Sequence, residues 1–355
     1  MKPALRGNKR ASVLLLCLAV VLLEACRKDL CYNHFRQAEI GIGWEYAWER
    51  DYGRDWSSHW DVEAYGMEYA DLCPGTPEGV TVVVYDEAGE YNERFLKPEG
   101  GNAILSEGTH SFLFYNNNTE YIVFNFDDMA ATLRPEEVRA TTTTRTRSTL
   151  KAMHSGERTV SPPDMLYGAF AENIPGVGLH ESVALPVVMR PLVYTYVIRY
   201  EFSSGLEHVA LARGALAGMA EAVYLWDGRT SDEKATILFD CEKTSWGAQA
   251  IVKSFGVPSF PDRYYPRARE AGEAAGHNYV LNLELRLQNG KVIELEPFDV
   301  TEQMQEQPRG GVITVRNVIV PESEFGVDSG FEIIVDDWDE YKDIDLEFGT
   351  ILPGK

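Results

Sequence analysis

Residues Leu281–Glu296 read LNLELRLQNGKVIELE, and this stretch decides the fold class. Its first half alternates leucine with polar residues, which is the period-two pattern of a β-strand with one buried face. Asn289-Gly290 follows, a pair that favours the type I′ turn of a hairpin because both residues tolerate positive φ. The second strand then runs to Glu296. The stretch therefore predicts an antiparallel β-hairpin.

Short apolar runs between turn residues recur along the chain, whereas helical periodicity is sparse. Asn116–Asn118, with an apolar run on each side, predicts another hairpin. Many short strands joined by turns are typical of an all-β chain built from antiparallel β-sandwiches. The strands expected besides the first hairpin are Gly79–Asp86, Ser111–Tyr115, Tyr121–Phe126, Val193–Phe202, Val312–Val320 and Phe331–Asp336.

The length predicts two domains in the mature chain. We place the N-terminal sandwich at residues 26–180 and the C-terminal sandwich at residues 181–355. Residues 129–164 contain no aromatic side chain and are rich in Thr and Ser. Such a composition buries little apolar surface, so we expect this segment to be a mobile loop in the N-terminal domain.

Residues 1–25 have the three parts of a bacterial signal peptide. A basic beginning is followed by the apolar run Ala11–Leu23, which is too short to span a bilayer. The run ends in Leu23-Glu24-Ala25-Cys26, which resembles the lipobox of bacterial lipoproteins. That resemblance implies cleavage before Cys26 and acylation of its thiol, as with palmitate. We expect Cys26 to hold the protein on a membrane.

The chain is strongly acidic, with a formal net charge of −22 over 355 residues. This charge opposes binding to the phosphate backbone of nucleic acids, which depends on Lys and Arg. It also opposes adhesion to anionic lipid headgroups, so the expected contact with a membrane is the covalent lipid.

No motif points to catalysis or to a bound metal. The chain has no nucleophile elbow, phosphate-binding loop, dinucleotide fingerprint or zinc-protease motif. No Cys and His spacing suggests zinc. We therefore predict a protein that is not an enzyme and that carries no cofactor beyond the lipid on Cys26.

Three cysteines follow Cys26, at positions 31, 73 and 241. In an oxidising cell envelope one disulfide can form, and Cys31 with Cys73 is the pair nearer in sequence. Three is an odd number, so at least one thiol stays unpaired. The sequence leaves open whether Cys31 and Cys73 form a disulfide.

Aromatic residues are dense near the start of the mature chain. Trp44, Tyr46 and Trp48 alternate as on one face of a strand, and Trp56 and Trp60 follow. We predict that these rings are buried in the core of a sandwich, because large aromatic side chains contribute most of the buried apolar area. The alternative is a carbohydrate-binding platform, which needs flat exposed rings.

Several short stretches resemble the fimbrillin-like lipoproteins of Bacteroidetes-type bacteria. They are DLCY at Asp29–Tyr32, MRPLVY at Met189–Tyr194, ALAGMA at Ala215–Ala220 and VDDW at Val335–Trp338. The likeness covers most of the mature chain, although the motifs concern packing and not chemistry.

The resemblance implies two tandem transthyretin-like sandwiches and a role as an anchor or accessory subunit of a fimbria. It further implies fimbrial subunits as partners, engaged by β-strand addition, and an outer-membrane location at the cell surface. Stalk subunits of that family are cut at an Arg near the first strand. We expect no such cut at Arg36, Arg50 or Arg54, because it would separate the lipid from the folded domain.

A glycan-binding lipoprotein of a polysaccharide-uptake system is the alternative function, and it would use the Trp44 to Trp60 aromatics. The identity of the partner subunit and a place at the base or tip of a fimbria are left open by the sequence.

Overall fold

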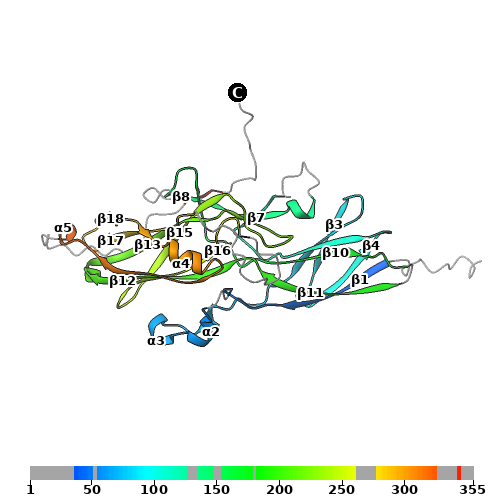
Figure 1. Cartoon of the computed structure of the whole chain (residues 1–355), viewed down its shortest axis with the longest axis horizontal. Coiled ribbons are helices and arrows are strands. Elements are labelled where there is room, and N and C mark those ends of the chain that lie inside the picture. Colours follow the sequence, from blue (N-terminus) through cyan, green and yellow to red (C-terminus); the bar gives the residue numbers. More distant parts are fainter. Residues whose placement is uncertain are drawn as a thin grey trace, which may run out of the picture.

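Most of the described chain is β-structure, in two sheet bodies that lie end to end along the long axis (Figure 1). The structure is a computed structural model that describes residues 36–50, 54–125, 134–146, 153–178, 181–260, 277–325 and 342–344. The prediction of a mostly β chain with two parts is confirmed.

The first body is one seven-stranded sheet that curves into a near-barrel, in the order β3-β2-β5-β10-β11-β1-β4. Its edge strands β3 and β4 are joined by a turn in which the Gly100 N–H donates to the Lys97 carbonyl at 2.9 Å. This turn brings the two edges of the sheet together. The strands are β1 (Arg36–Trp44), β2 (Val80–Tyr85), β3 (Tyr91–Leu96), β4 (Gly100–Leu105), β5 (His110–Asn116), β10 (Tyr167–Ile174) and β11 (Ser182–Pro191).

The near-barrel encloses an apolar core. Val82 of β2 points inward and packs with Phe112 and Phe114 of β5. Val83, on the opposite face of β2, is also covered and only 3% exposed. Because β2 is buried on both faces, its sequence VTVVVY is a continuous apolar run and not an alternation.

A small three-stranded sheet covers the outer face of β2 and β5. Its order is β14-β7-β6, with β6 (Ile122–Phe124), β7 (Arg139–Thr142) and β14 (Ala222–Tyr224). Phe124 and Val223 of this sheet share one apolar cluster with Leu113 of the first body and Phe255 of the second. The cluster therefore joins the two bodies.

The second body is a half-barrel made by an eleven-stranded sheet. Its main path runs β18-β17-β13-β15-β16-β12-β20, with β19 on β17 and with β9, β8 and β21 on a side branch from β15. The strands are β8 (Thr144–Thr146), β9 (Arg158–Val160), β12 (Tyr194–Ser204), β13 (Val209–Ala220), β15 (Lys234–Lys243), β16 (Gly247–Ser254), β17 (Val280–Leu287), β18 (Val292–Glu294), β19 (Phe298–Asp299), β20 (Gly311–Ile319) and β21 (Lys342–Ile344).

One face of β12 contributes to the core of the half-barrel. Tyr196, Ile198 and Tyr200 of β12 are fully buried in it, together with Met304 of a helix that precedes β20. The described helical elements are short: α2 (Trp56–His59), α3 (Val62–Tyr65), α4 (Thr301–Glu306), α5 (Glu322–Phe325) and the 3-10 turns η1 (Tyr69–Leu72), η3 (Pro135–Glu137) and η4 (Leu206–His208).

The hairpin at Leu281–Glu296 is confirmed as β17 and β18. Its turn differs from the prediction, because Asn289 does not adopt positive φ whereas Gly290 does, at 81°. The Leu287 N–H donates to the Lys291 carbonyl at 2.8 Å, which closes a three-residue loop with glycine in the left-handed position. The polar face of β17 is buried too: Glu284 is 1% exposed and pairs with Arg213 of β13.

The segment between β1 and β2 leaves the first body and packs on the outer face of the second. Trp48 is fully buried there with Val197 of β12 and Val312 of β20. The Thr195 N–H donates to the Trp48 carbonyl at 2.7 Å. Helices α2 and α3 lie below β12 as a result (Figure 1). This segment is a second connection between the bodies.

The predicted division at residues 180 and 181 falls before β11, which pairs with β1 and β10 of the first sheet. The chain passes into the second sheet only at β12, after Pro191. The reason is that β1 takes β11 as a parallel neighbour, a pairing that local sequence does not encode.

Residues 129–164 were expected to form a mobile loop, but their described parts hold η3, β7, β8 and β9. Threonine is β-branched and suits strands. The Thr141 hydroxyl also donates to the Glu221 carbonyl at 2.7 Å, and the Thr142 hydroxyl donates to the Ser161 carbonyl. These hydrogen bonds supply the order that apolar burial alone would not.

Two further predictions, both about strand pairing, are wrong. The strands flanking Asn116–Asn118 do not form a hairpin, since β5 pairs with β2 and β10 whereas β6 pairs with β7. The sheets are also not purely antiparallel, because β1–β11, β12–β20 and β9–β15 are parallel pairs. In each body the main strands belong to one hydrogen-bonded sheet.

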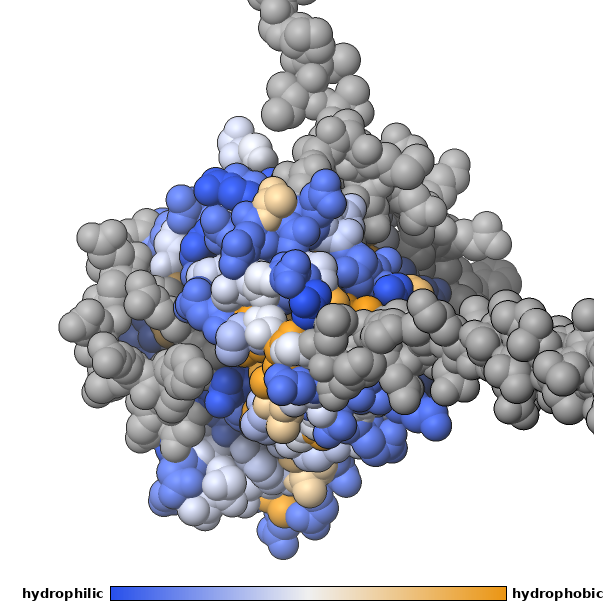
Figure 2. Space-filling model, turned by 90° about the vertical axis from the view of Figure 1, so that its right-hand side faces the viewer, coloured by the Kyte–Doolittle hydropathy of each residue, from blue (hydrophilic) through white to orange (hydrophobic). Residues whose placement is uncertain are grey.

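Figure 2 looks onto the end of the first body, at the right of Figure 1. An apolar strip lies there between hydrophilic residues. β1 begins at this end of the molecule (Figure 1).

Candidate functional site

A protein that binds partners by β-strand addition needs a strand edge whose backbone groups are not already paired. Along the main path of the described second sheet, three edges qualify by topology: β18, β20 and part of β16. The three differ in length and in what covers them.

The edge strand β18 is only three residues long, so it offers few backbone groups. The outer edge of β20 is covered by side chains of α4. The Gln307 amide accepts from the Val312 N–H at 2.7 Å and donates to the Val312 carbonyl at 3.0 Å. Gln303 makes the same two bonds with Thr314, at 2.9 and 3.1 Å.

The two glutamines thus replace a neighbouring strand. They lie one helical turn apart, which is the spacing that puts side chains on one face of a helix. Val312 and Thr314 lie two apart along β20, so their backbone groups point to the same edge. This part of β20 is closed to an incoming strand as long as α4 stays in place.

The edge of β16 is open because the sheet divides at β15. β15 pairs with β16 only at Glu242–Gln249 and Lys243–Ala248, and its residues 235–237 pair with β9 instead. β16 stays paired with β12 as far as Ser254. Within the described chain, the β16 edge from residue 250 to 254 therefore has no strand partner on the side of the division.

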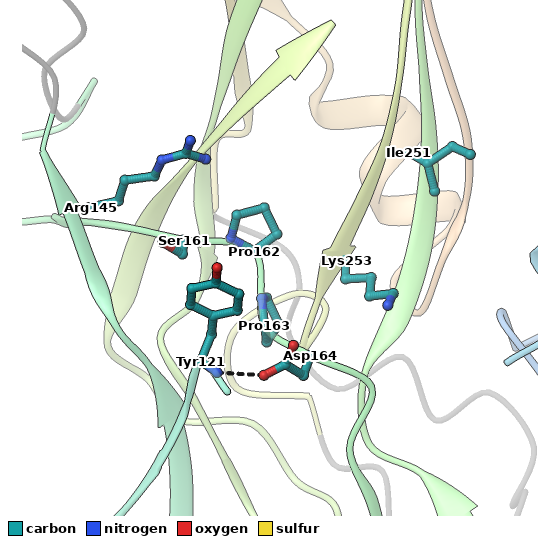
Figure 3. A pocket seen from close by; sticks show the side chains of 8 residues that line it. All are labelled: Tyr121, Arg145, Ser161, Pro162, Pro163, Asp164, Ile251 and Lys253. Atoms are coloured by element: carbon teal, nitrogen blue, oxygen red, sulfur yellow. Dashed lines mark hydrogen bonds between the residues drawn. The ribbon is translucent and has the colours of Figure 1, made fainter. Parts of the chain in front are cut away.

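A cavity of about 340 Å³ lies in this division (Figure 3). Its volume is within the range of about 300–1,000 Å³ that is common for ligand sites. Four segments line it: the chain before β6, β8, the chain after β9, and β16. The lining residues are Tyr121, Arg145, Ser161, Pro162, Pro163, Asp164, Ile251 and Lys253.

Prolines hold the division open. Pro162 and Pro163 line the wall that faces β16 (Figure 3). Proline has no backbone N–H, so neither residue can donate to a β16 carbonyl and extend the sheet. The wall is instead fixed by Asp164, whose carboxylate accepts from the Tyr121 N–H and, at 2.6 Å, from the Glu120 N–H.

The outer face of β16 carries two side chains into the cavity. Ala250 and Val252 point into the core of the second body. Because successive side chains of a strand alternate in direction, Ile251 and Lys253 point outward. Ile251 is 53% exposed. The open edge thus combines an apolar and a cationic group.

The charges of the cavity are unequally balanced. The Arg145 guanidinium lies 3.5 Å from the Asp240 carboxylate and donates to the Leu238 carbonyl at 3.3 Å. The Asp164 carboxylate is held by backbone N–H groups. Lys253 forms no ion pair with any residue that the structure describes. A local cationic group is notable in a chain of net charge −22.

The aromatic platform, which is the alternative to core filling, is not presented as one surface. β1 ends at Trp44, so Trp44, Tyr46 and Trp48 do not continue along a single strand face. The Trp44 indole donates to the Pro98 carbonyl at 2.9 Å, Tyr46 is 46% exposed, and Trp48 is fully buried. Trp48 meets the Trp60 ring edge-on at 5.5 Å. Whether these rings bind a glycan stays a prediction.

The predicted lipidation site Cys26 and its neighbour Cys31 lie outside the described residues. The Cys31–Cys73 disulfide therefore stays a prediction. Cys73 is half-buried beside the Trp48 cluster, and this burial raises the pKa of its thiol.

No described helix has the length and apolar character needed to cross a membrane. No group of three or more His, Cys, Asp or Glu side chains in that part of the chain is placed to hold a metal ion.

Sequence reasoning did not find the cavity. Pro162-Pro163 lies in the segment that the sequence predicts to be a mobile loop, and Ile251-Val252-Lys253 carries no motif. The available signal was local: an apolar residue and a cation on the outer face of a strand, and two adjacent prolines near another. Only the folded chain brings the two together.

A family model described as a domain of unknown function (DUF5119) matches residues 68–240. A protein of Bacteroides ovatus, provisionally named fimbrium anchoring subunit Fim4B, is 25% identical over 242 residues, which is 66% of this chain and 69% of that protein. A crystal structure of a provisionally named adhesin from Bacteroides ovatus is 20% identical, with a TM-score of 0.54 over 83% of this chain and 98% of that one. The latter match supports the fold.

Proposed function

We propose that this chain is a member of the fimbrial anchor and adhesin family of the Bacteroidetes and acts as a lipid-anchored fimbrial anchor or accessory subunit. Membership in this family makes it a non-enzymatic protein, as the sequence predicts. The proposal includes the signal peptide, the outer-membrane location at the cell surface and a transthyretin-like identity of the two bodies. Fimbrial subunits are the proposed partners.

The place of β1 supports an intact tether. β1 is paired on both sides, with β11 and with β4. Its residues Ala38 and Ile40 are at most 4% exposed in the near-barrel core. A cut after Arg50 or Arg54 would leave this strand with the lipid and separate it from the rest of the sheet. We therefore propose that the mature protein begins at Cys26 and keeps β1.

The same geometry orients the molecule. Cys26 precedes β1 by ten residues, and ten residues span at most about 36 Å when extended. The end of the first body where β1 begins would then face the membrane. The second body lies at the opposite end of the long axis (Figure 1), where a neighbouring subunit can reach it.

The observation that carries the proposed mode of binding is the open edge of β16 in the divided sheet. Strand addition obtains its affinity from main-chain hydrogen bonds, and this edge offers unpaired main-chain groups beside a cavity. Glutamine side chains cover the β20 edge at Val312 and Thr314, and β18 is only three residues long, so we assign strand addition to the β16 edge.

The tether is tested by cell fractionation of a Cys26→Ala variant. We expect a folded protein that leaves the membrane fraction and no longer retains fimbrial subunits at the cell surface. Cys73→Ala is the matched control and should stay with the membrane. A Cys26→Ala protein that remained membrane-bound would contradict the lipid anchor, and a mature N-terminus after Arg36, Arg50 or Arg54 would contradict the intact tether.

Glycan binding by a polysaccharide-uptake lipoprotein is the weaker alternative. Tyr46 is the exposed ring of the predicted platform, and its hydroxyl lies 2.6 Å from that of Thr76. A pull-down from outer membranes separates the two functions. Co-purified fimbrial subunits support the anchor, whereas retention on a polysaccharide gel that is lost in Tyr46→Ala supports the alternative.

A further inference from the structure

The side chains along the open β16 edge indicate what kind of strand it accepts. A strand that pairs with β16 would place its side chains opposite Ile251, Val252 and Lys253 in turn. On one face of a sheet, directly opposed side chains lie about 4.5–5.5 Å apart and interact. The residues of β16 therefore select the residues of the partner, position by position.

Opposite Ile251, the side chain of the partner strand should be apolar. Ile251 is 53% exposed on the outer face of β16, and Pro162 and Pro163 lie across the cavity. An aliphatic side chain opposite Ile251 would remove this surface from water, which is favourable in proportion to the area buried. A polar side chain there would gain nothing comparable.

Two residues further along β16, at Lys253, the side chain of the partner strand should be anionic. Lys253 has no carboxylate partner among the described residues, and the cavity also holds the Arg145 guanidinium. Arg145 is already beside Asp240, and the nearby Asp164 is held by two backbone N–H groups. An acidic side chain opposite Lys253 would supply the missing counter-charge. A second cation there would be repelled.

We propose that the segment which adds to β16 carries an aliphatic side chain opposite Ile251 and a Glu or Asp opposite Lys253. This inference rests on the proposed strand addition and specifies its partner. The preferred segment alternates aliphatic, any and acidic residues. Binding runs along one edge only, because the proline wall offers no N–H donors to the far side of the incoming strand.

The test uses the full chain in detergent and an acetylated, amidated heptapeptide of sequence Thr-Ile-Thr-Glu-Thr-Ile-Thr. Isoleucine on both sides of the Glu puts an aliphatic residue opposite Ile251 whichever way the strand runs. Its analogue with Gln in place of Glu is the matched probe. We expect the Glu peptide to bind about fivefold more tightly than the Gln peptide, as for a partly exposed ion pair.

Variants assign this preference to the site. Lys253→Gln should make the two peptides bind equally, whereas Lys97→Gln, which removes an exposed lysine of the first body, should leave the preference intact. Ile251→Thr should weaken both peptides alike. A preference that survives in Lys253→Gln would overturn the inference.

The two proposals fail in different ways. Equal binding of both peptides by the unaltered chain, abolished by N-methylation of the peptide backbone, would sustain strand addition and overturn the acidic preference. No binding of either peptide would overturn strand addition at β16 and this inference with it. Free glucuronate that binds in a Lys253-dependent manner, without peptide binding, would assign the cavity to an acidic sugar instead.

Discussion

Replacing Gln307 by Leu should open the edge of β20 and destabilise the second body. Gln307 is 3% exposed, and its amide satisfies both the N–H and the carbonyl of Val312, a residue that is 5% exposed. A buried backbone group without a partner costs about 1–3 kcal/mol, so the two groups together cost about 2–6 kcal/mol. The free energy of unfolding, measured by urea denaturation, should fall by that amount.

Hydrogen exchange reports the same event at one atom. The Val312 amide should lose protection in Gln307→Leu, because its acceptor is gone. Gly311 gives an independent route to the same loss. A Cβ at this glycine would lie 2.1 Å from the Gln307 side-chain oxygen, and its φ of 145° strains other residues. Gly311→Ala should therefore also expose the Val312 amide.

The control is Gln305→Leu, the same change at an exposed position of α4. It should alter the free energy of unfolding by no more than about 0.5 kcal/mol, as is usual for surface substitutions. Unchanged protection of the Val312 amide in Gln307→Leu would refute the view that glutamine replaces a strand partner there.

Three further outcomes follow from buried groups. Removing one partner of the Arg213–Glu284 pair, in which the side chains are 7% and 1% exposed, should cost about 3–5 kcal/mol. The double variant Arg213→Met/Glu284→Leu should cost far less than the sum of the single changes in urea denaturation, and additive losses would argue against coupling. His110 is 2% exposed beside Ser106, and burial lowers its pKa from 6.5. Its unfolded form therefore binds a proton first as the pH falls, so the free energy of unfolding should decrease below about pH 6.5 and level off below the lowered pKa. His110→Gln should reduce this pH dependence, and an identical profile would contradict the assignment. At Gly247 a Cβ would lie 1.8 Å from the Tyr200 carbonyl oxygen, so Gly247→Ala should lower stability by about 1–3 kcal/mol, with a correspondingly lower Tm in calorimetry. An unchanged Tm would mean that β12 and β16 can move apart to accommodate the Cβ without loss of stability, which would contradict the prediction.

Local periodicity predicted the individual strands well. The leucines of β17 and the aromatic face of β12 are buried as their spacing indicates. The run Val80–Tyr85 forms one strand, and both faces of it are covered. In each case the pattern follows from the alternation of side chains across a strand. This alternation is a local property that depends only on neighbouring residues.

The sequence by itself thus determined the strand-rich class, the faces of its main strands and the absence of a catalytic motif. The tertiary structure alone decided which strands pair, as when residue 37 of β1 meets residue 182 of β11. It also decided that the sheet divides at β15, with the proline wall facing Lys253. The physical reason is that an apolar strand face indicates that the face is buried but does not identify the strand that pairs with it. Pairing across some 145 residues depends on the arrangement of the whole chain.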